Sequence, residues 1–256
     1  MAERPQRPAG RRGPERSPRS AEAAETRQPY RPARKPGPRR PELPEDRPFV
    51  PRDAWRDLRA TAPQNVLDDV VKAVGGAAEA LEAGEIERAT QLLQWAKSVA
   101  PRTATIREAL GIALYDGDNY AQAQAELLAY RRLSGSVDQN HLLADCARAL
   151  GRPEKVEAYI DEMAAANVDP ARMAEGLIVL AGERADRGDL EGALDALRRA
   201  DLSPVEIQPW HPRMWYVAGD LSERMGRTAQ AREFFSAIVA LDADFGDAEE
   251  RLMALG

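Results

Sequence analysis

Apolar residues recur at helical spacing from about residue 53 to the C-terminus, and polar turns interrupt them at regular intervals. The segment GEIERATQLLQWAKSVAP (84–101) shows one such unit. It opens on Gly84, passes through a polar turn, places small residues at Ala89 and Ala96, and stops at Pro101. Apolar positions three or four residues apart lie on one face of an α-helix. The spacing therefore predicts an amphipathic helix that follows a glycine turn.

The same pattern returns four more times along the chain. The positions equivalent to Ala89 are small or aliphatic, and they are separated by 34, 33, 37 and 38 residues. Such a near-constant period indicates a repeat architecture. The later copies are GDNYAQAQAELLAY (117–130), GRPEKVEAYIDEM (151–163), GDLEGALDALRRA (188–200) and GRTAQAREFFSAI (226–238), with Ala123, Val156, Ala193 and Ala231 at the equivalent positions.

A second helical pattern precedes each glycine, so the unit is helix–turn–helix. These first helices are expected within 65–83, 103–116, 138–150, 170–187 and 211–225, with small residues near their middles at Gly76, Gly111, Ala144, Ala181 and Gly219. Glycine is the residue that most readily adopts the left-handed conformation at the end of a helix. We therefore expect the first helices to end at left-handed glycines, namely Gly84, Gly151, Gly188 and Gly226.

The small residues mark places where helices approach closely. We expect larger side chains to fill the space beside them, among them Leu93, Leu127, Leu197 and Phe235. No single helix pair can bury its own apolar face, so neighbouring pairs must stack. The chain is therefore predicted to be an all-α solenoid of five helix pairs.

These repeats resemble the tetratricopeptide repeat (TPR) family over roughly residues 65–241. The last unit matches best, with Trp215, Ala218–Gly219, Gly226, Ala231 and Phe235, whereas the first departs in having Gly75–Gly76 in mid-helix. The resemblance implies a right-handed superhelix of about five TPR-like pairs with terminal caps. The expected divisions are a tail (1–48), a short capping helix with its linker (49–64), repeats at 65–101, 102–136, 137–168, 169–208 and 209–241, and a C-terminal capping helix (242–256).

The charge of the chain is divided unevenly. Residues 1–48 carry 13 Lys and Arg against 7 Asp and Glu, a net of +6, and since the whole chain has a net charge of −6, the remainder carries −12. The tail is rich in Pro and Arg and almost free of large aliphatic residues, a composition typical of disorder. Its segment Pro41–Asp46, PELPED, also resembles the end of the leader in a group of actinobacterial TPR proteins, which favours a bacterial, cytoplasmic origin.

Three roles are open for this tail. It could contact the phosphates of RNA or of a ribosome, lie in the acidic groove of its own chain, or act as a passive tether. The electrostatic contacts would come from Arg11, Arg12, Arg31, Arg34, Lys35, Arg39 and Arg40. Any binding to nucleic acid is expected through the tail only.

In TPR arrays the first helices line a concave groove that holds a partner peptide or helix. Projecting the polar positions of these helices inward nominates Tyr115, Asp138, His141, Asp145, Arg148, Glu175, Arg213, Tyr216, Asp220 and Glu223. The set leans acidic, which fits a basic or apolar-basic protein segment. The Lys, Asn and Arg clamp of chaperone-binding TPR domains is absent from these positions. Trp210, in the long link QPWHPRMW (208–215), is expected to pack under that link or to form an exposed hot-spot.

Other chemistry finds little support. Asp138, His141 and Asp145 share a helical face, but a metal site needs ligands from more than one element, so a solvated polar face is expected. Cys146 is expected to be a small buried residue, and a single cysteine suits a reducing cytoplasm. No cofactor motif, nucleophile–base pair, secretory signal or membrane span is seen. The sequence predicts a non-enzymatic TPR scaffold or adaptor regulated by its tail, or alternatively an RNA- or ribosome-associated factor; it does not set the oligomeric state.

Overall fold

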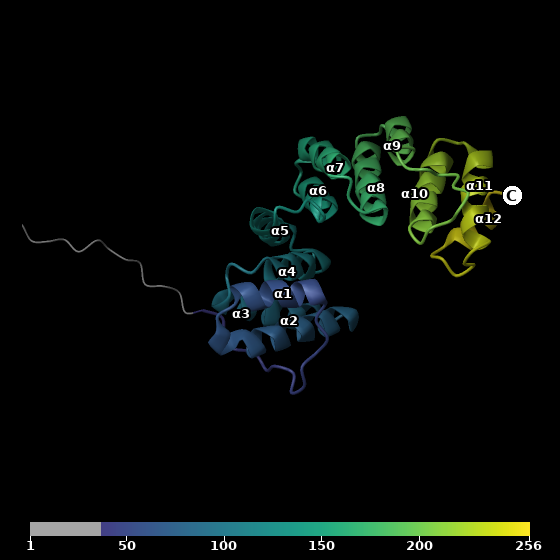
Figure 1. Cartoon of the computed structure of the whole chain (residues 1–256). Helices are drawn as coiled ribbons and strands as arrows, with labels where there is room; N and C mark the ends of the chain where they lie inside the picture. The colour runs from purple at the N-terminus through teal and green to yellow at the C-terminus, as the bar shows by residue number, and fades with distance from the viewer. Residues whose placement is uncertain (1–36) are drawn as a thin grey trace, which may run out of the picture. The chain divides into compact units, whose positions relative to one another are not determined.

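The computed structural model describes residues 37–256, in which all regular secondary structure is helical. Figure 1 shows these helices following one another along the chain. They are α1 (Arg52–Thr61), α2 (Leu67–Glu82), α3 (Ile86–Val99), α4 (Ala104–Asp116), α5 (Tyr120–Ser134), α6 (Asn140–Ala149), α7 (Val156–Ala165), α8 (Pro170–Asp186), α9 (Leu190–Leu197), α10 (His211–Arg224), α11 (Thr228–Val239) and α12 (Ala248–Ala254), with short 3₁₀ turns at Gln64–Val66 and Pro153–Lys155.

The ten helices from α2 to α11 pack as five antiparallel pairs. The first helix of each pair contacts the first helix of the next, in the series α2, α4, α6, α8 and α10. The second helices pack against their own partners and against the following pair. The prediction of an all-α solenoid of TPR-like pairs is therefore confirmed for the part of the chain that the structure describes.

Left-handed glycines end the first helices as predicted. Gly84, Gly151, Gly188 and Gly226 have φ angles of +74°, +67°, +83° and +72°. The second pair has a different turn. Gly117 is not left-handed, and the next residue, Asp118, is left-handed instead, with a φ of +58°. Asp is among the few residues besides glycine that tolerate this conformation.

Glycines in mid-helix mark the closest helix contacts. A Cβ atom at Gly111 would lie 2.7 Å from the side chain of Leu127, and one at Gly219 would lie 2.9 Å from the ring of Phe235. Leu127 and Phe235 are fully buried. The larger side chains expected beside these glycines are thus in place. Cys146 is buried as predicted, and Trp215 is buried too.

An extended segment covers the helix that departs most from the repeat. Residues 40–51, which we call the strap, cross α2 where Gly75 and Gly76 leave its backbone bare. A Cβ at Gly75 would lie 2.7 Å from Pro48, and one at Gly76 would lie 2.7 Å from Pro44. Lys72 Nζ donates a hydrogen bond of 2.8 Å to the Glu45 carbonyl, and Arg40 pairs with Asp69 at 2.9 Å. The two glycines are therefore explained by the strap rather than by contact between repeats.

The described unit accordingly begins at Gly37, inside the segment 1–48 that its composition assigned to the tail. Pro44, Pro48 and Leu43 supply the apolar contacts that composition alone did not reveal. The expected basic contacts at Arg11, Arg12, Arg31, Arg34 and Lys35 lie outside the described residues. Of the two that are described, Arg39 is exposed, whereas Arg40 pairs with Asp69 and lies 5.9 Å from the centre of the Trp95 ring.

The strap leads into α1, which packs across α2 and α4. Asp57 of α1 accepts hydrogen bonds from the backbone N–H and the hydroxyl of Thr105, at 2.8 and 2.9 Å. This carboxylate therefore caps the first turn of α4, where backbone N–H groups lack helical partners. Leu58 is fully buried beneath α1, and the hydroxyls of Thr61 and Thr103 lie 2.7 Å apart.

The C-terminal helix α12 closes the other end of the array. Arg251 pairs with Asp220 at 2.9 Å and with Glu223 at 2.6 Å, and its guanidinium lies 4.7 Å from the centre of the Phe235 ring. Desolvation lowers the pKa of Arg251, but the bonds to these carboxylates and to Tyr216 outweigh it and raise the pKa overall. None of the helices within residues 37–256 combines the length and the apolar character that crossing a bilayer requires.

Candidate functional site

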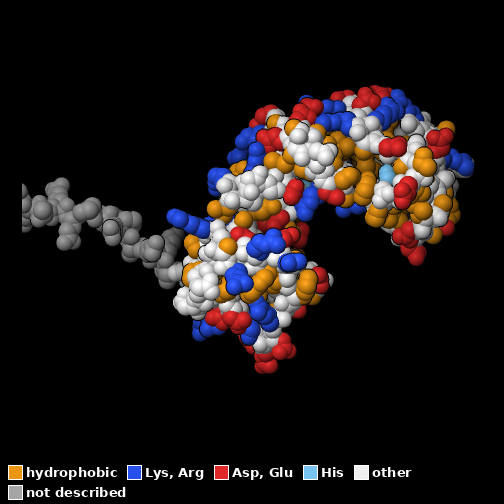
Figure 2. All heavy atoms as spheres, in the orientation of Figure 1, with side chains coloured by type: hydrophobic (Ala, Val, Ile, Leu, Met, Phe, Trp, Pro, Cys, Tyr) orange, Lys and Arg blue, Asp and Glu red, His pale blue; other side chains and the backbone are white. Residues whose placement is uncertain are grey.

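A cavity of about 470 Å³ lies among the first helices of the second to fifth pairs. Its lining comes from α4, α6, α8 and α10. Together with α2, these first helices form what we call the inner face. Figure 2 shows apolar side chains on the hollowed side of α8 and α10, with charged side chains around them. We call this cavity the mid-array pocket, and its lining is Tyr115, His141, Leu142, Asp145, Arg148, Glu175, Ile178, Val179, Gly182, Arg213 and Val217.

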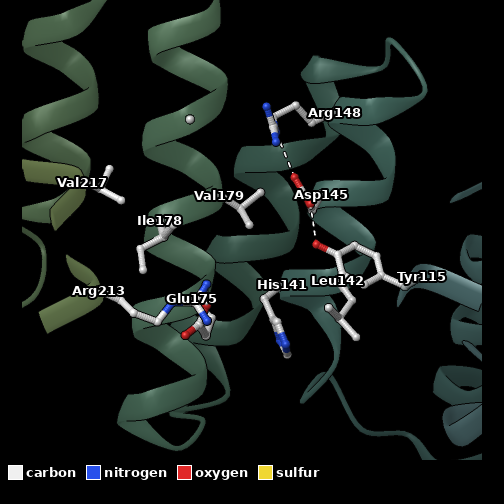
Figure 3. A pocket seen from close by; sticks show the side chains of 11 residues that line it. Tyr115, His141, Leu142, Asp145, Arg148, Glu175, Ile178, Val179, Arg213 and Val217 are labelled. Atoms are coloured by element: carbon white, nitrogen blue, oxygen red, sulfur yellow. Dashed lines mark hydrogen bonds and ion pairs between the residues drawn. The ribbon is translucent and has the colours of Figure 1, made fainter. Parts of the chain in front are cut away.

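One wall of the mid-array pocket is a connected set of hydrogen bonds (Figure 3). The Tyr115 hydroxyl donates to Asp145 at 2.6 Å, and Arg148 donates to the other Asp145 oxygen at 2.9 Å. Arg148 also donates to Asp186 at 2.7 Å. Burial, followed by the bond to Asp145, raises the pKa of Tyr115, so the phenol stays protonated and remains a donor. The wall is therefore formed in advance, with its polar groups satisfied within the chain.

The opposite wall is a single ion pair. Arg213 on α10 pairs with Glu175 on α8 at 3.1 Å, and the Arg213 side chain is more exposed than that of Glu175. Among the lining residues the charges are therefore balanced, with Asp145 and Glu175 against Arg148 and Arg213. The acidic lean expected from the sequence is absent from the mid-array pocket itself. Arg148 neutralises Asp145 on the same helix, and Arg213 on α10 neutralises Glu175 on α8.

His141 lines the pocket as a neutral imidazole. Its Nδ1 lies 3.1 Å from the Asp138 carbonyl, which can only accept, so the proton sits on Nδ1 and leaves Nε2 as an acceptor. Burial is the main cause that lowers its pKa to about 4, and the charge of Arg172 adds to the effect, against opposing contributions from Asp138.

Aliphatic side chains form the floor between the two walls. Leu142 comes from α6, Ile178 and Val179 from α8, and Val217 from α10. Figure 3 shows Ile178 and Val179 between the Tyr115 wall and the Arg213 wall. None of these four residues was predicted for the groove, because the nominated positions were all polar. The signal was present, since each of them is adjacent to or three to four residues from a nominated polar residue on the same helix.

Six of the ten residues predicted for the groove line the mid-array pocket: Tyr115, His141, Asp145, Arg148, Glu175 and Arg213. Asp138 lies at the start of α6, beside the pocket, where its carbonyl contacts His141 and accepts from Arg172. The structure places the remaining three elsewhere. Tyr216 donates to Asp247 at 2.6 Å, and Asp220 and Glu223 pair with Arg251, so these side chains hold α12.

Trp210 has a partly buried side chain that packs against the core formed by the third to fifth pairs. It lies beside His211, with ring centres 5.6 Å apart, and it borders a separate surface cavity with Val168 and Met173.

Within residues 37–256 the structure gathers no group of three or more His, Cys, Asp or Glu side chains that could hold a metal ion. Asp145, one of the three candidate ligands, is fully engaged by Tyr115 and Arg148.

Comparisons with known proteins bear on the fold. No family model matches the sequence, and no curated protein matches it. Among solved structures, the chain is similar to YrrB, described as a TPR protein with an unusual peptide-binding site, with 19% identity, a TM-score of 0.48, and coverage of 77% of this chain and 97% of that one. It is also similar to a chain in the structure of Naa15/Naa10 bound to HypK-THB, with 16% identity, a TM-score of 0.36, and coverage of 80% of this chain but 37% of that one.

The helix pairs themselves carry the assignment of the fold. Five consecutive pairs share one register of small residues, left-handed turns and stacked first helices. Residues 37–256 therefore form a TPR-like helical array.

Proposed function

We propose that this protein is a non-enzymatic scaffold that binds a peptide or helix of a partner protein in the mid-array pocket. The observation that carries the proposal is the aliphatic floor of Leu142, Ile178, Val179 and Val217, set between two walls whose charged groups are already paired. A preformed cavity with an apolar floor and a few fixed polar groups is the usual form of a ligand site.

The chemistry of the pocket favours a ligand with an aliphatic side chain between polar neighbours. The floor gains free energy by burying apolar surface. The walls present both signs of charge, so they fix the register of the ligand more than they select a basic one. Arg213 and Glu175 are the groups best placed to exchange their mutual ion pair for contacts with a ligand, because Arg213 is largely exposed.

A peptide-display library selected against the full chain tests the proposal. Selected 12-residue peptides should lose at least about tenfold in affinity for the Val179→Asp variant, since the carboxylate would stand in the aliphatic floor. The matched control is Val205→Asp, which changes a fully exposed valine in the link before α10. The proposal fails if no peptide is selected, or if the selected peptides bind Val179→Asp as tightly as they bind the wild type.

Two roles of the tail stay predictions, namely regulation of peptide binding and contact with RNA. Deleting residues 1–36 from the full chain tests whether the tail regulates peptide binding: regulation predicts a changed affinity for the selected peptides. The RNA- or ribosome-associated alternative predicts binding to ribosomal RNA that weakens steeply with salt and is lost with the tail.

A further inference from the structure

A second cavity, of about 250 Å³, lies where the strap and α1 meet the first two pairs. Its walls come from the strap, the start of α1, α2 and α4, together with Leu93 of α3. Residues outside the repeats thus build one side of it. We call this cavity the N-terminal socket and define it by Phe49, Val74, Ala78, Leu81, Ala109 and Ile112.

The socket is apolar, its one charged lining residue is acidic, and the helices around it carry a small excess of negative charge. Among its described lining residues Glu108 alone is charged, and one of its carboxylate oxygens accepts from Gln139 at 2.8 Å. The helices that line it, α1 to α4, together carry nine acidic and seven basic residues. Among the basic residues, Lys72 binds the strap and Arg107 pairs with Glu126 at 2.6 Å. Among the acidic ones, Asp69 pairs with Arg40 and Asp57 accepts from Thr105. Glu108 is therefore the carboxylate that defines the charge of the lining.

Phe49 stands at the rim of the socket with 83% of its surface exposed. The neighbouring Pro48 is held against α2 at Gly75, and the Phe49 carbonyl would lie 3.4 Å from a Cβ there. Packing of the backbone on α2 therefore fixes where the ring emerges. An exposed aromatic ring beside an apolar cavity is a common feature of binding sites, where large aromatic side chains act as anchors.

We propose that the N-terminal socket binds a partner peptide that carries one large uncharged side chain flanked by Lys or Arg. The side chain enters the cavity, Phe49 covers it, and the flanking cations face Glu108. The size of the cavity limits the anchor to a single aromatic or large aliphatic side chain. Complementary charge around an apolar anchor steers the peptide and sets its orientation. This site is separate from the mid-array pocket, so it stands independently of the function proposed there.

Fluorescence anisotropy of a labelled peptide, GKRFRKG, with the full chain tests the proposal. Binding should fall at least tenfold for Ala78→Trp, because Ala78 is an exposed residue of α2 and its indole would fill the socket. The matched control is Ala125→Trp, at an exposed position in the middle of α5, which should bind as the wild type does. Unchanged binding by Ala78→Trp overturns the proposal.

Two control peptides separate the anchor from the charge. GKRGRKG lacks the aromatic side chain, and GEDFDEG reverses the charges; each should bind at least tenfold more weakly than GKRFRKG. Equal binding of the glycine peptide would show attraction by charge alone and would contradict the proposal, and equal binding of the acidic peptide would do the same.

Two more variants distinguish this site from the mid-array pocket. Phe49→Ala should weaken binding severalfold without altering the circular-dichroism melting curve, because the ring makes little contact within the chain. Val179→Asp should leave the anisotropy titration unchanged. If Val179→Asp abolishes binding instead, the peptide occupies the mid-array pocket, which overturns the socket and supports the proposed function.

Discussion

The inner face differs between its two halves. Over α2 and the start of α4 it is covered by the chain's own strap and α1, which leave only the small N-terminal socket. Over α6, α8 and α10 it is open and forms the larger mid-array pocket. The helices come from the same repeat in both halves, so the repeat itself does not decide which part of the face is accessible.

The difference lies in how glycines are used. Gly111 and Gly219 receive side chains from the partner helix of the same pair, and so they belong to the packing of the repeat. Gly75 and Gly76 instead receive Pro48 and Pro44 from a segment outside the repeats. A small residue in mid-helix therefore marks a close approach without saying which part of the chain makes it.

The largest effect on stability is expected at a contact between the two helices of a repeat, the kind of packing that both halves share. Leu127→Ala should lower the free energy of unfolding by about 3 kcal/mol, because it empties the space against Gly111 in a fully buried position. Urea unfolding followed by circular dichroism measures this. Leu133→Ala, at an exposed site on the same helix, should cost less than about 0.5 kcal/mol. Equal costs for the two variants would contradict the packing described here.

The contact between the strap and α2 can be disrupted without disturbing the open half. Gly76→Val should cost about 2 kcal/mol, because the new side chain collides with Pro44 and pushes the strap from α2. Hydrogen exchange should then quicken in α1 and the strap and stay unchanged in α8 to α11. Gly37→Val is the control, since a Cβ there would meet nothing within 4 Å. Faster exchange throughout the array would show that the strap is not a separate layer.

The contact between α1 and α4 should have a smaller and local cost. Asp57→Ala removes the carboxylate that caps Thr105, so it should lower the free energy of unfolding by about 1 kcal/mol. Asp53→Ala, on the exposed side of the same helix, should change it by less than about 0.5 kcal/mol. Chemical denaturation of both variants tests the difference, and a larger loss for Asp53→Ala would contradict the capping role.

The smallest effect on stability is expected in the open half, where the free energy of unfolding should depend on pH through His141. The pKa of His141 falls from its ordinary 6.5 to about 4 on folding, so the unfolded chain binds the proton more tightly. The resulting stability is present above pH 6.5 and is lost as the pH falls toward 4. Allowing for screening by solvent, wild type should lose roughly 0.5–1 kcal/mol more than His141→Gln between pH 7.5 and pH 5. Parallel losses in the two proteins would contradict a buried neutral His141.

The sequence predicted the repeat well because each unit carries its own signals. Glycines at 84, 151, 188 and 226, the small residues of the first helices and the fully buried Leu127 and Phe235 all follow from local geometry. The position of the strap on α2 could not be predicted from this local geometry. Gly75–Gly76 stood out as a departure, but the partner was a Pro-rich segment whose composition alone suggested disorder.

The candidate site was predictable in part, because helical periodicity is a local signal whereas contacts between helices are not. Six polar residues were placed on the mid-array pocket by helical periodicity. Tyr216, Asp220 and Glu223 share that periodicity, but α12 engages them through Asp247 and Arg251. The neutral charge of the pocket also escaped prediction, because it depends on which Arg pairs with which carboxylate, within α6 in one case and between α8 and α10 in the other.

Disulfide trapping tests most directly whether the chain's own N-terminal segment covers the inner face. Thr61→Cys and Thr103→Cys, combined with Cys146→Ala, place thiols where the two hydroxyls lie 2.7 Å apart. Mild oxidation of the full chain should give a nearly complete intramolecular disulfide, seen by mass spectrometry of the digested protein. The control pair Thr61→Cys with Ala125→Cys should give none. Absence of a disulfide between positions 61 and 103, or links between chains only, would contradict the account.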